Sequence, residues 1–265
     1  MSASSATGLQ GRHAVVTGGG RGIGAAIAEA LAASGAHVTL MGRTASALDE
    51  QARALRNRYG TSVHTTACDV TNPEDVTQAF DSAVRTLGDV QVLVNNAGQA
   101  GAAAFDDIEL DTWNRLIAVN LTGTLLCTQQ VLSGMIAARS GRVVNIASTA
   151  GLKGYARLGA YCATKHGVVG LTRALAAETA RTGVTVNAVC PGYTEGTEMF
   201  TAAVSNVMRA RDVSADEARA LLARPSPRGT VITLREVADT VLWLCSPGAS
   251  AITGQAIAVA AGEVM

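Results

Sequence analysis

Tyr161 and Lys165 are the residues whose types and spacing first suggest chemistry in this chain. They stand in the segment YCATK, and Lys165 is one of two lysines, with Lys153, among 21 basic residues. Residues four apart in a helix lie on one face, so the ammonium and the phenol can share a site. A phenol has a reference pKa of about 10, and a nearby cation favours its ionised form. The pair therefore predicts a general acid/base.

A glycine loop follows the first apolar run of the chain. Its sequence is TGGGRGIG over residues 17–24, and it leads directly into an alanine-rich stretch. Glycines let the backbone approach a pyrophosphate, and the N–H groups of the following helix favour its charge. The loop uses Gly18, Gly22 and Gly24 and holds no G-x-G-x-x-G match, which indicates a particular subset of dinucleotide folds.

The end of the second strand predicts which dinucleotide binds. An acidic residue for the ribose 2′-hydroxyl is expected there, but residues 40–46 read LMGRTAS and the next carboxylate is Asp49. Arg43 stands at the expected place, and Arg21 lies in the glycine loop. Two guanidiniums can flank a 2′-phosphate, so NADP(H) is preferred over NAD(H), which stays possible. The alternative is that both are ordinary surface arginines.

The elements that must position these residues follow an alternating pattern. Short apolar runs rich in β-branched residues recur with helix-like segments between them. We expect strands at 13–17, 38–41, 63–67, 91–95, 142–147, 184–190 and 256–260, and helices at 22–34, 45–58, 74–87, 111–138, 160–182 and 234–246. This predicts an α/β fold, a single-domain Rossmann-like, doubly wound, seven-stranded parallel sheet with helices on both faces, over residues 1–265.

Residues 194–230 break this alternation. They follow the sixth strand and are predicted to form one or two helices ending in a Pro-rich loop. Ligands of open α/β sheets bind beyond the carboxyl ends of the strands, so the insertion is predicted to be a substrate lid. The alternative is a solvated helical pair that packs between subunits.

Composition excludes several other classes of protein. The formal net charge is +0, the pI is about 6.9 and aromatic residues are 3%, which argues against nucleic-acid and anionic-membrane partners. The five scattered cysteines form no C-x-x-C pair, so no metal site is expected and a reducing cytoplasm fits best. The opening MSASSATGLQG lacks the features of a secretory signal, and no membrane-length apolar run is evident.

Taken together, the motifs resemble those of the short-chain dehydrogenase/reductase family over nearly the whole chain. The set comprises T-G-x-x-x-G-x-G at 17–24, N-N-A-G at 95–98, Asn120, Ser148, Tyr161-x-x-x-Lys165 and Pro191-Gly192. The resemblance implies that Tyr161 is the general acid/base and that Ser148 hydrogen-bonds the substrate oxygen. It also implies that Lys165 binds the nicotinamide ribose, that Asn120 holds a water in the proton relay, and that the enzyme is a homotetramer.

The resemblance also implies the remaining ligand contacts. Asp69 would reach the adenine with Val70 beside it, and Thr194 would meet the nicotinamide carboxamide. The full cofactor set is Gly18, Arg21, Gly22, Ile23, Gly24, Arg43, Asp69, Val70, Asn96, Ala97, Gly98, Tyr161, Lys165, Pro191, Gly192, Thr194 and Thr197. The predicted substrate contacts are Ser148, Gln99, Tyr155 and Tyr193.

Two departures from the family pattern stand near the end of the chain. Gly196 is inserted before Thr197, which leaves the register of Thr197 open. Ala260 and Ala261 replace an Asp-Gly-Gly-like turn, in the sequence VAAGEVM at 259–265.

Residues 164–192 are similar to bacterial 3-oxoacyl reductases and aromatic polyketide ketoreductases, so a 3-oxoacyl thioester or polyketide-like ketone is the expected substrate. Arginines at 209, 211, 219, 224 and 228 could receive thioester-arm phosphates, but an ordinary solvated helix face is favoured because acidic residues are interleaved. Two alternatives stay open. One is an NAD(P)-dependent dehydrogenase of a free or cyclic secondary alcohol, and the other is an inactive nucleotide-binding regulator.

Overall fold

The sheet has seven parallel strands in the order β3-β2-β1-β4-β5-β6-β7. The structure, a computed structural model, describes residues 8–264, so most of the opening segment lies outside the described residues. The strands are β1 (His13–Thr17), β2 (His37–Gly42), β3 (Val63–Ala67), β4 (Val92–Asn95), β5 (Gly141–Ile146), β6 (Val184–Pro191) and β7 (Ala256–Val259). This order and direction confirm the predicted doubly wound sheet.

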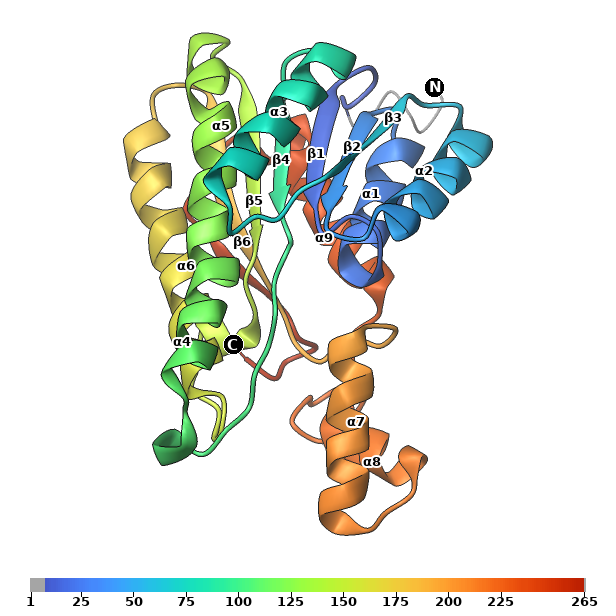
Figure 1. Ribbon diagram of the computed structural model, residues 1–265, viewed down its shortest axis with the longest axis vertical. Coiled ribbons are helices and arrows are strands. Elements are labelled where there is room, and N and C mark those ends of the chain that lie inside the picture. The colour runs from blue at the N-terminus through green and yellow to red at the C-terminus, as the bar shows by residue number, and fades with distance from the viewer. Residues whose placement is uncertain (1–7, 265) are drawn as a thin grey trace.

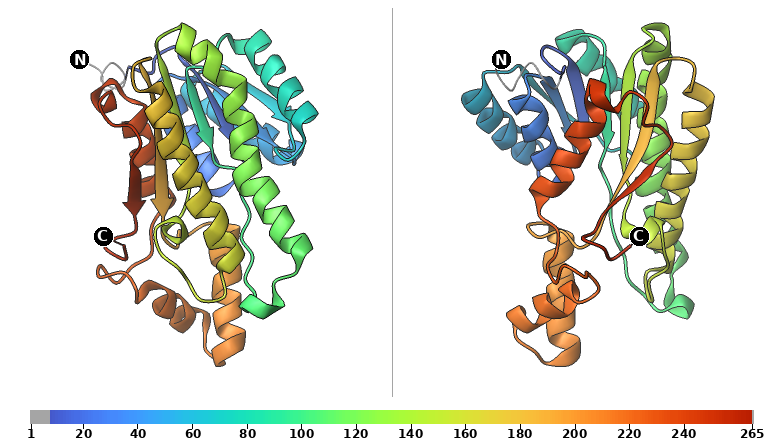
Figure 2. Two further views of the ribbon diagram at one scale, coloured as in Figure 1. Left: turned by 90° about the vertical axis from the view of Figure 1, so that its left-hand side faces the viewer. Right: turned by 180° about the vertical axis from the view of Figure 1, so that it is seen from behind.

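Helices cover both faces of the sheet (Figures 1 and 2). One face carries α1 (Gly22–Ala33), α2 (Ala45–Tyr59) and α9 (Leu234–Cys245). The other carries α3 (Pro73–Leu87), α5 (Gly123–Ala137) and α6 (Gly159–Thr179). The helices predicted around these segments begin and end within three residues of the observed bounds, apart from the one discussed below.

The strands alternate their side chains between two hydrophobic cores. In β1, Ala14 and Val16 join the core under α1 and α9, whereas Val15 joins the core under α3 and α5. Successive side chains of a strand point to opposite faces, so a sheet covered twice needs apolar residues at every position. All five residues of β1 are accordingly buried.

The helix expected over 111–138 is divided. The structure has α4 (Leu110–Ile117), a π-helical turn η3 (Ala118–Thr122) and then α5, and Asn120 lies in the π turn. Composition does not distinguish a π turn from α-helix, and such turns often occur at functional sites. The run Leu110–Ala137 is long and apolar enough to cross a membrane by length and composition alone. However, α5 packs on β4, β5 and α3 as a layer of the sheet.

The predicted lid segment contains α7 (Glu198–Arg211) and α8 (Ala215–Ala223), which lie beyond the carboxyl ends of the strands (Figure 1). Phe200, Val204 and Ala218 form a small core between the two helices.

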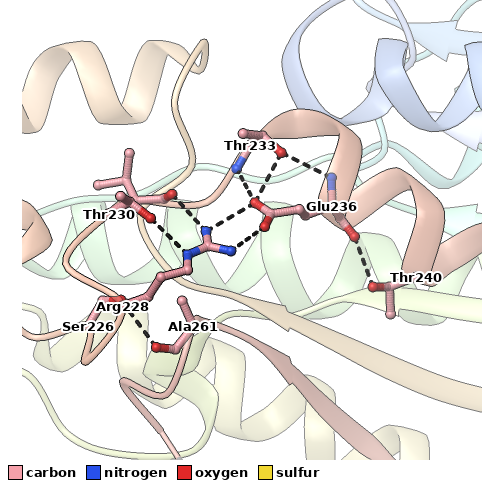
Figure 3. A network of polar contacts seen from close by, with 8 residues as sticks. Ser226, Arg228, Thr230, Thr233, Glu236, Thr240 and Ala261 are labelled. Carbon is pink, nitrogen blue, oxygen red and sulfur yellow. Dashed lines mark hydrogen bonds and ion pairs between the residues drawn. The ribbon is translucent and has the colours of Figure 1, made fainter.

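A polar network fixes the loop that returns from the lid (Figure 3). The Arg228 guanidinium pairs with the Glu236 carboxylate and donates to Thr230 Oγ1 at 2.8 Å. Glu236 also closes a capping box with Thr233 at the start of α9. Arg228 is therefore engaged within the chain, as are Arg219, which pairs with Asp216, and Arg209, which donates to Asn206. These contacts agree with the favoured interpretation of the lid arginines as an ordinary solvated face.

Candidate active site

The glycine loop is braced by the N-N-A-G segment. Asn96 Nδ2 donates to the carbonyls of Thr17 at 2.9 Å and Gly18 at 3.2 Å. The backbone N–H groups of Asn96 and Ala97 both donate to Thr17 Oγ1 at 3.0 Å. Gly18 has φ +65°, and a Cβ on Gly24 would lie 2.2 Å from the Gly18 carbonyl oxygen. The loop therefore requires glycine at these two positions.

The start of α1 fits an anion. Its N-cap residue, Arg21, makes no side-chain capping hydrogen bond, and a Cβ on Gly22 would meet Thr197 Cγ2 at 3.7 Å and no closer atom. The first N–H groups of a helix need a partner, and a phosphate supplies one. Thr197 of the loop before α7 therefore lies beside the glycine loop, and its contact with the diphosphate stays a prediction. Ile23 packs on the core beneath α1.

The two arginines predicted for the 2′-phosphate have different surroundings. Arg21 Nη1 pairs with Glu198 of α7 at 2.9 Å, an exposed contact between the glycine loop and the lid. Arg43 is exposed and lies near Asp69. Backbone and side-chain hydrogen bonds from Thr71, with a smaller effect of Arg43, hold the pKa of Asp69 below its ordinary value. Val70, next to Asp69, is buried in the core under α3 and α5.

Tyr161 and Lys165 are buried together on α6. Their exposed fractions are 6% and 4%, and Lys165 Nζ lies 5.8 Å from the centre of the Tyr161 ring. The ammonium donates to the Ile146 carbonyl at 2.8 Å, which ties α6 to the end of β5. Ser148 lies two residues beyond that strand end, where its Oγ accepts from Ala150 N and its side chain is near enough to Tyr161 to lower the pKa of that phenol.

Burial sets the protonation of this pair. Desolvation raises the pKa of Tyr161 to about 12, against the lowering effect of the Ser148 side chain. Desolvation also lowers the pKa of Lys165 to about 8. That the ammonium together with an oxidised nicotinamide lowers the pKa of the phenol stays a prediction. Among the chain's own groups, loss of water is the largest effect on both side chains, because both lie in a dry interior.

Asn120 joins the π turn to the segment after β4. Its Nδ2 donates to the Gln99 carbonyl at 2.9 Å and to Thr164 Oγ1 at 3.0 Å, and its Oδ1 accepts from Gln99 N at 2.8 Å. A Cβ on Gly98 would lie 3.2 Å from Asn120 Oδ1 and 3.5 Å from Lys165 Nζ. Asn120, Gly98 and Lys165 are thus neighbours.

The segment after β6 completes the carboxyl edge of the sheet, where the candidate site lies. Thr194 is buried, donates to the Gly192 carbonyl at 3.0 Å and bridges to Ile232. Gly196 takes φ +82°, a left-handed conformation that absorbs the inserted residue. Thr197 Oγ1 then donates to the Thr194 carbonyl and accepts from Phe200 N, so Thr197 caps α7.

The predicted substrate residues do not all gather at Tyr161. Tyr155 packs on the buried cluster of Ala150, Tyr161 and Cys162. Tyr193 packs on Phe200 of the lid, with ring centres 6.3 Å apart, and slightly raises the pKa of Tyr161. The Gln99 side chain instead accepts a hydrogen bond from Arg115.

Sequence reasoning did not assign Glu263 and Lys153 to the site, although both lie beside it. Glu263, from the atypical end of the chain, pairs with Lys153 at 3.3 Å and accepts a hydrogen bond from Tyr155. The rarity of lysine and the departure at 259–265 were the available signals, but neither specified the contact.

The chain belongs to the short-chain dehydrogenase family, whose model matches residues 12–207. It is 43% identical over 251 residues to granaticin polyketide synthase putative ketoacyl reductase 1 of Streptomyces violaceoruber, covering 94% of this chain and 92% of that protein. It is 39% identical to the 3-oxoacyl-[acyl-carrier-protein] reductase FabG of Aquifex aeolicus, covering 96% and 98%. The crystal structure of a variant of actinorhodin polyketide ketoreductase with NADPH superposes with a TM-score of 0.91 at 38% identity and 99% coverage of both chains. The predicted family is confirmed.

Proposed function

We propose that this protein is an NADP(H)-dependent ketoreductase that reduces a 3-oxoacyl thioester or a polyketide-like ketone to the secondary alcohol. The observation that carries the proposal is the burial of Tyr161 and Lys165 together, with the half-buried Ser148 next to Tyr161, beside an uncapped helix behind a glycine loop. The relatives named as ketoacyl and 3-oxoacyl reductases support the choice of substrate.

Tyr161 is proposed to be the general acid of the reduction. A protonated phenol is the form that gives a proton to a carbonyl oxygen, and Tyr161 is protonated at neutral pH because its pKa is raised to about 12. Ser148 is proposed to donate a hydrogen bond to the same oxygen. Lys165 is proposed to hold a positive charge behind Tyr161 and to hydrogen-bond the nicotinamide ribose. When bound, NADPH would supply the hydride.

The cofactor site is proposed to use the glycine loop for the diphosphate and Arg43 with Arg21 for the 2′-phosphate. Arg21 also pairs with Glu198. A phosphate can still bind there, because a guanidinium has five N–H donors and the pair is exposed. Bound NADPH in the structure with a TM-score of 0.91 supports the preference for NADP(H). The homotetramer and the cytoplasmic location stay predictions, as does the division into one catalytic domain with a lid. Exposed Leu125 and Ile136 on α5 are compatible with subunit contacts.

The test is reduction of acetoacetyl-CoA and of cyclohexanone, followed by NADPH absorbance. Tyr161→Phe should lower kcat by roughly 100- to 10,000-fold, the range for loss of a general acid, while NADPH still binds. Tyr59→Phe is the matched control, because it deletes a hydroxyl that bonds Glu29 far from the site. Substantial turnover by Tyr161→Phe would refute the assignment.

The same assay separates the alternatives. Activity on cyclohexanone without activity on the thioester would exclude the first choice of substrate. Turnover only of secondary alcohols with NADP⁺ would favour the dehydrogenase. Nucleotide binding without turnover in either direction would favour the inactive regulator.

A further inference from the structure

Lys153, the lysine outside the proposed catalytic pair, has a buried partner. Lys153 lies in the loop between Ser148 and Tyr161, and its Nζ is 3.3 Å from Glu263 Oε1 and donates to the Glu263 carbonyl at 3.2 Å. The Glu263 side chain is 7% exposed, whereas that of Lys153 is 39% exposed. A buried carboxylate needs a cation and hydrogen bonds, so this contact is specific to the folded chain.

The same carboxylate holds Tyr155. The Tyr155 hydroxyl is hydrogen-bonded to Glu263 and, at 2.8 Å, to Thr149 Oγ1. A phenol has one proton and a carboxylate can only accept, so Tyr155 donates to Glu263 and accepts from Thr149. The Lys153 ammonium also lies 4.9 Å from the centre of the Tyr155 ring. Three groups thus fix the position of this ring.

Tyr155 in turn contacts the proposed site. Its ring packs on the cluster that contains Tyr161, and its hydrogen-bond partner Thr149 follows Ser148 directly. On the opposite side, a Cβ on Gly192 would lie 3.0 Å from Glu263 Oε2. The carboxylate therefore lies between the loop after β5 and the loop after β6, which flank the proposed substrate site.

The turn that precedes Glu263 is held in a strained conformation. Ala261 has φ +50°, in the left-handed region that glycine favours. Ser226 Oγ donates to the Ala261 carbonyl at 3.2 Å, and Glu263 N donates to the Ala260 carbonyl at 3.0 Å. The contacts of the lid's return loop thus preserve the turn although alanine replaces glycine.

We propose that Glu263 is a positioning residue for ketone reduction, which holds Tyr155 and Lys153 so that they form the substrate-side wall next to Tyr161. This inference rests on the proposed function. It predicts an effect on substrate binding that exceeds any effect on cofactor binding, because the ion pair and the side-chain hydrogen bond of Glu263 lie with Lys153 and Tyr155. Its carboxylate only lies next to Gly192 of the predicted cofactor set.

The experiment compares Glu263→Ala, Tyr155→Phe and the double variant with the wild type, using acetoacetyl-CoA, cyclohexanone and NADPH. Each single variant should raise KM for the better ketone about tenfold with kcat changed less than about threefold, and NADPH affinity by fluorescence should be unchanged. If Glu263 acts through Tyr155, the double variant should be no worse than Glu263→Ala. Additive effects, or KM within about twofold of the wild type in Glu263→Ala, would overturn the proposal.

Two further variants separate positioning from folding. Glu236→Gln removes another paired carboxylate of the same chain, at the return loop, and should lower Tm without changing KM. If Glu263→Ala does not fold, Lys153→Met combined with Glu263→Met leaves no charge unpaired and should raise KM similarly. A wild type without reductase activity would overturn the proposed function as well, whereas an active wild type with unchanged variants overturns this inference alone.

Discussion

Replacing Lys165 by methionine should inactivate the enzyme and yet stabilise its fold at neutral pH. Burial lowers the pKa of Lys165 from 10.5 to about 8. A difference of about 2.5 means that the charged form costs the folded protein roughly 3 kcal/mol below pH 8. Methionine fills similar space without that cost, but leaves the Ile146 carbonyl without its donor at 2.8 Å, a loss of about 1–3 kcal/mol. We expect a net gain of about 1 kcal/mol at about pH 7.

The change of this stability difference with pH is a sharper test than its value at one pH. The hydrogen bond to Ile146 is present in both charged and neutral lysine, so its contribution does not change with pH. The folded pKa is lowered, so the unfolded chain binds more protons between about pH 8 and 10.5, and wild-type stability rises with pH through that window. Between about pH 7 and about pH 9.5 the wild type should gain about 2 kcal/mol relative to Lys165→Met.

The assay is urea unfolding of both proteins without nucleotide at the two pH values. Lys153→Met is the control, since it removes the other lysine but leaves the buried Glu263 carboxylate without its ammonium. It should destabilise the protein at both pH values, the opposite sign to Lys165→Met at neutral pH. A stability difference between the wild type and Lys165→Met that does not change with pH would refute the claim that burial governs Lys165.

Two further predictions concern groups at the edges of the site. Arg43→Asp should lower the ratio of kcat/KM for NADPH over NADH by at least about tenfold, because a carboxylate repels the 2′-phosphate, and an unchanged ratio would contradict the cofactor assignment. Glu236→Gln should lower the free energy of unfolding at neutral pH by about 1 kcal/mol, since it breaks an exposed pair with Arg228. The pKa of Glu236 is lowered from 4.5 to about 2, so this loss should shrink as pH falls from 4.5 toward about 2 in urea titrations; an equal loss at about pH 7 and pH 3 would count against it.

The fold and the central pair of the site were predictable because their signals are local. Apolar runs mark buried strands, and the observed bounds of all seven strands lie within a residue of those predicted. The four-residue spacing of Tyr161 and Lys165 gives a shared helical face from helix geometry alone. The glycine loop likewise carries its conformational requirement in its residue types, as Gly18 and Gly24 show.

Other features depend on contacts between distant segments. The π turn at Ala118–Thr122 has the composition of an ordinary helix, so its position is set by packing around Asn120. Lys153 and Glu263 are far apart in sequence, and only the folded chain brings them together. The raised pKa of Tyr161 has the same origin, because counting nearby charges in the sequence omits the water that folding removes.

The use of lysine at 165 in a chain otherwise rich in arginine follows from that dry environment. A guanidinium stays charged at any accessible pH, whereas an ammonium can lose its proton when burial demands it. Arginine is also bulkier than lysine, and the Lys165 Nζ already makes a contact of 2.8 Å with the Ile146 carbonyl. Lys165→Arg should therefore destabilise the fold at both pH values, in contrast to Lys165→Met, and should not restore turnover. A stable and active Lys165→Arg protein would show that the site needs only a positive charge, and would contradict the role assigned to burial.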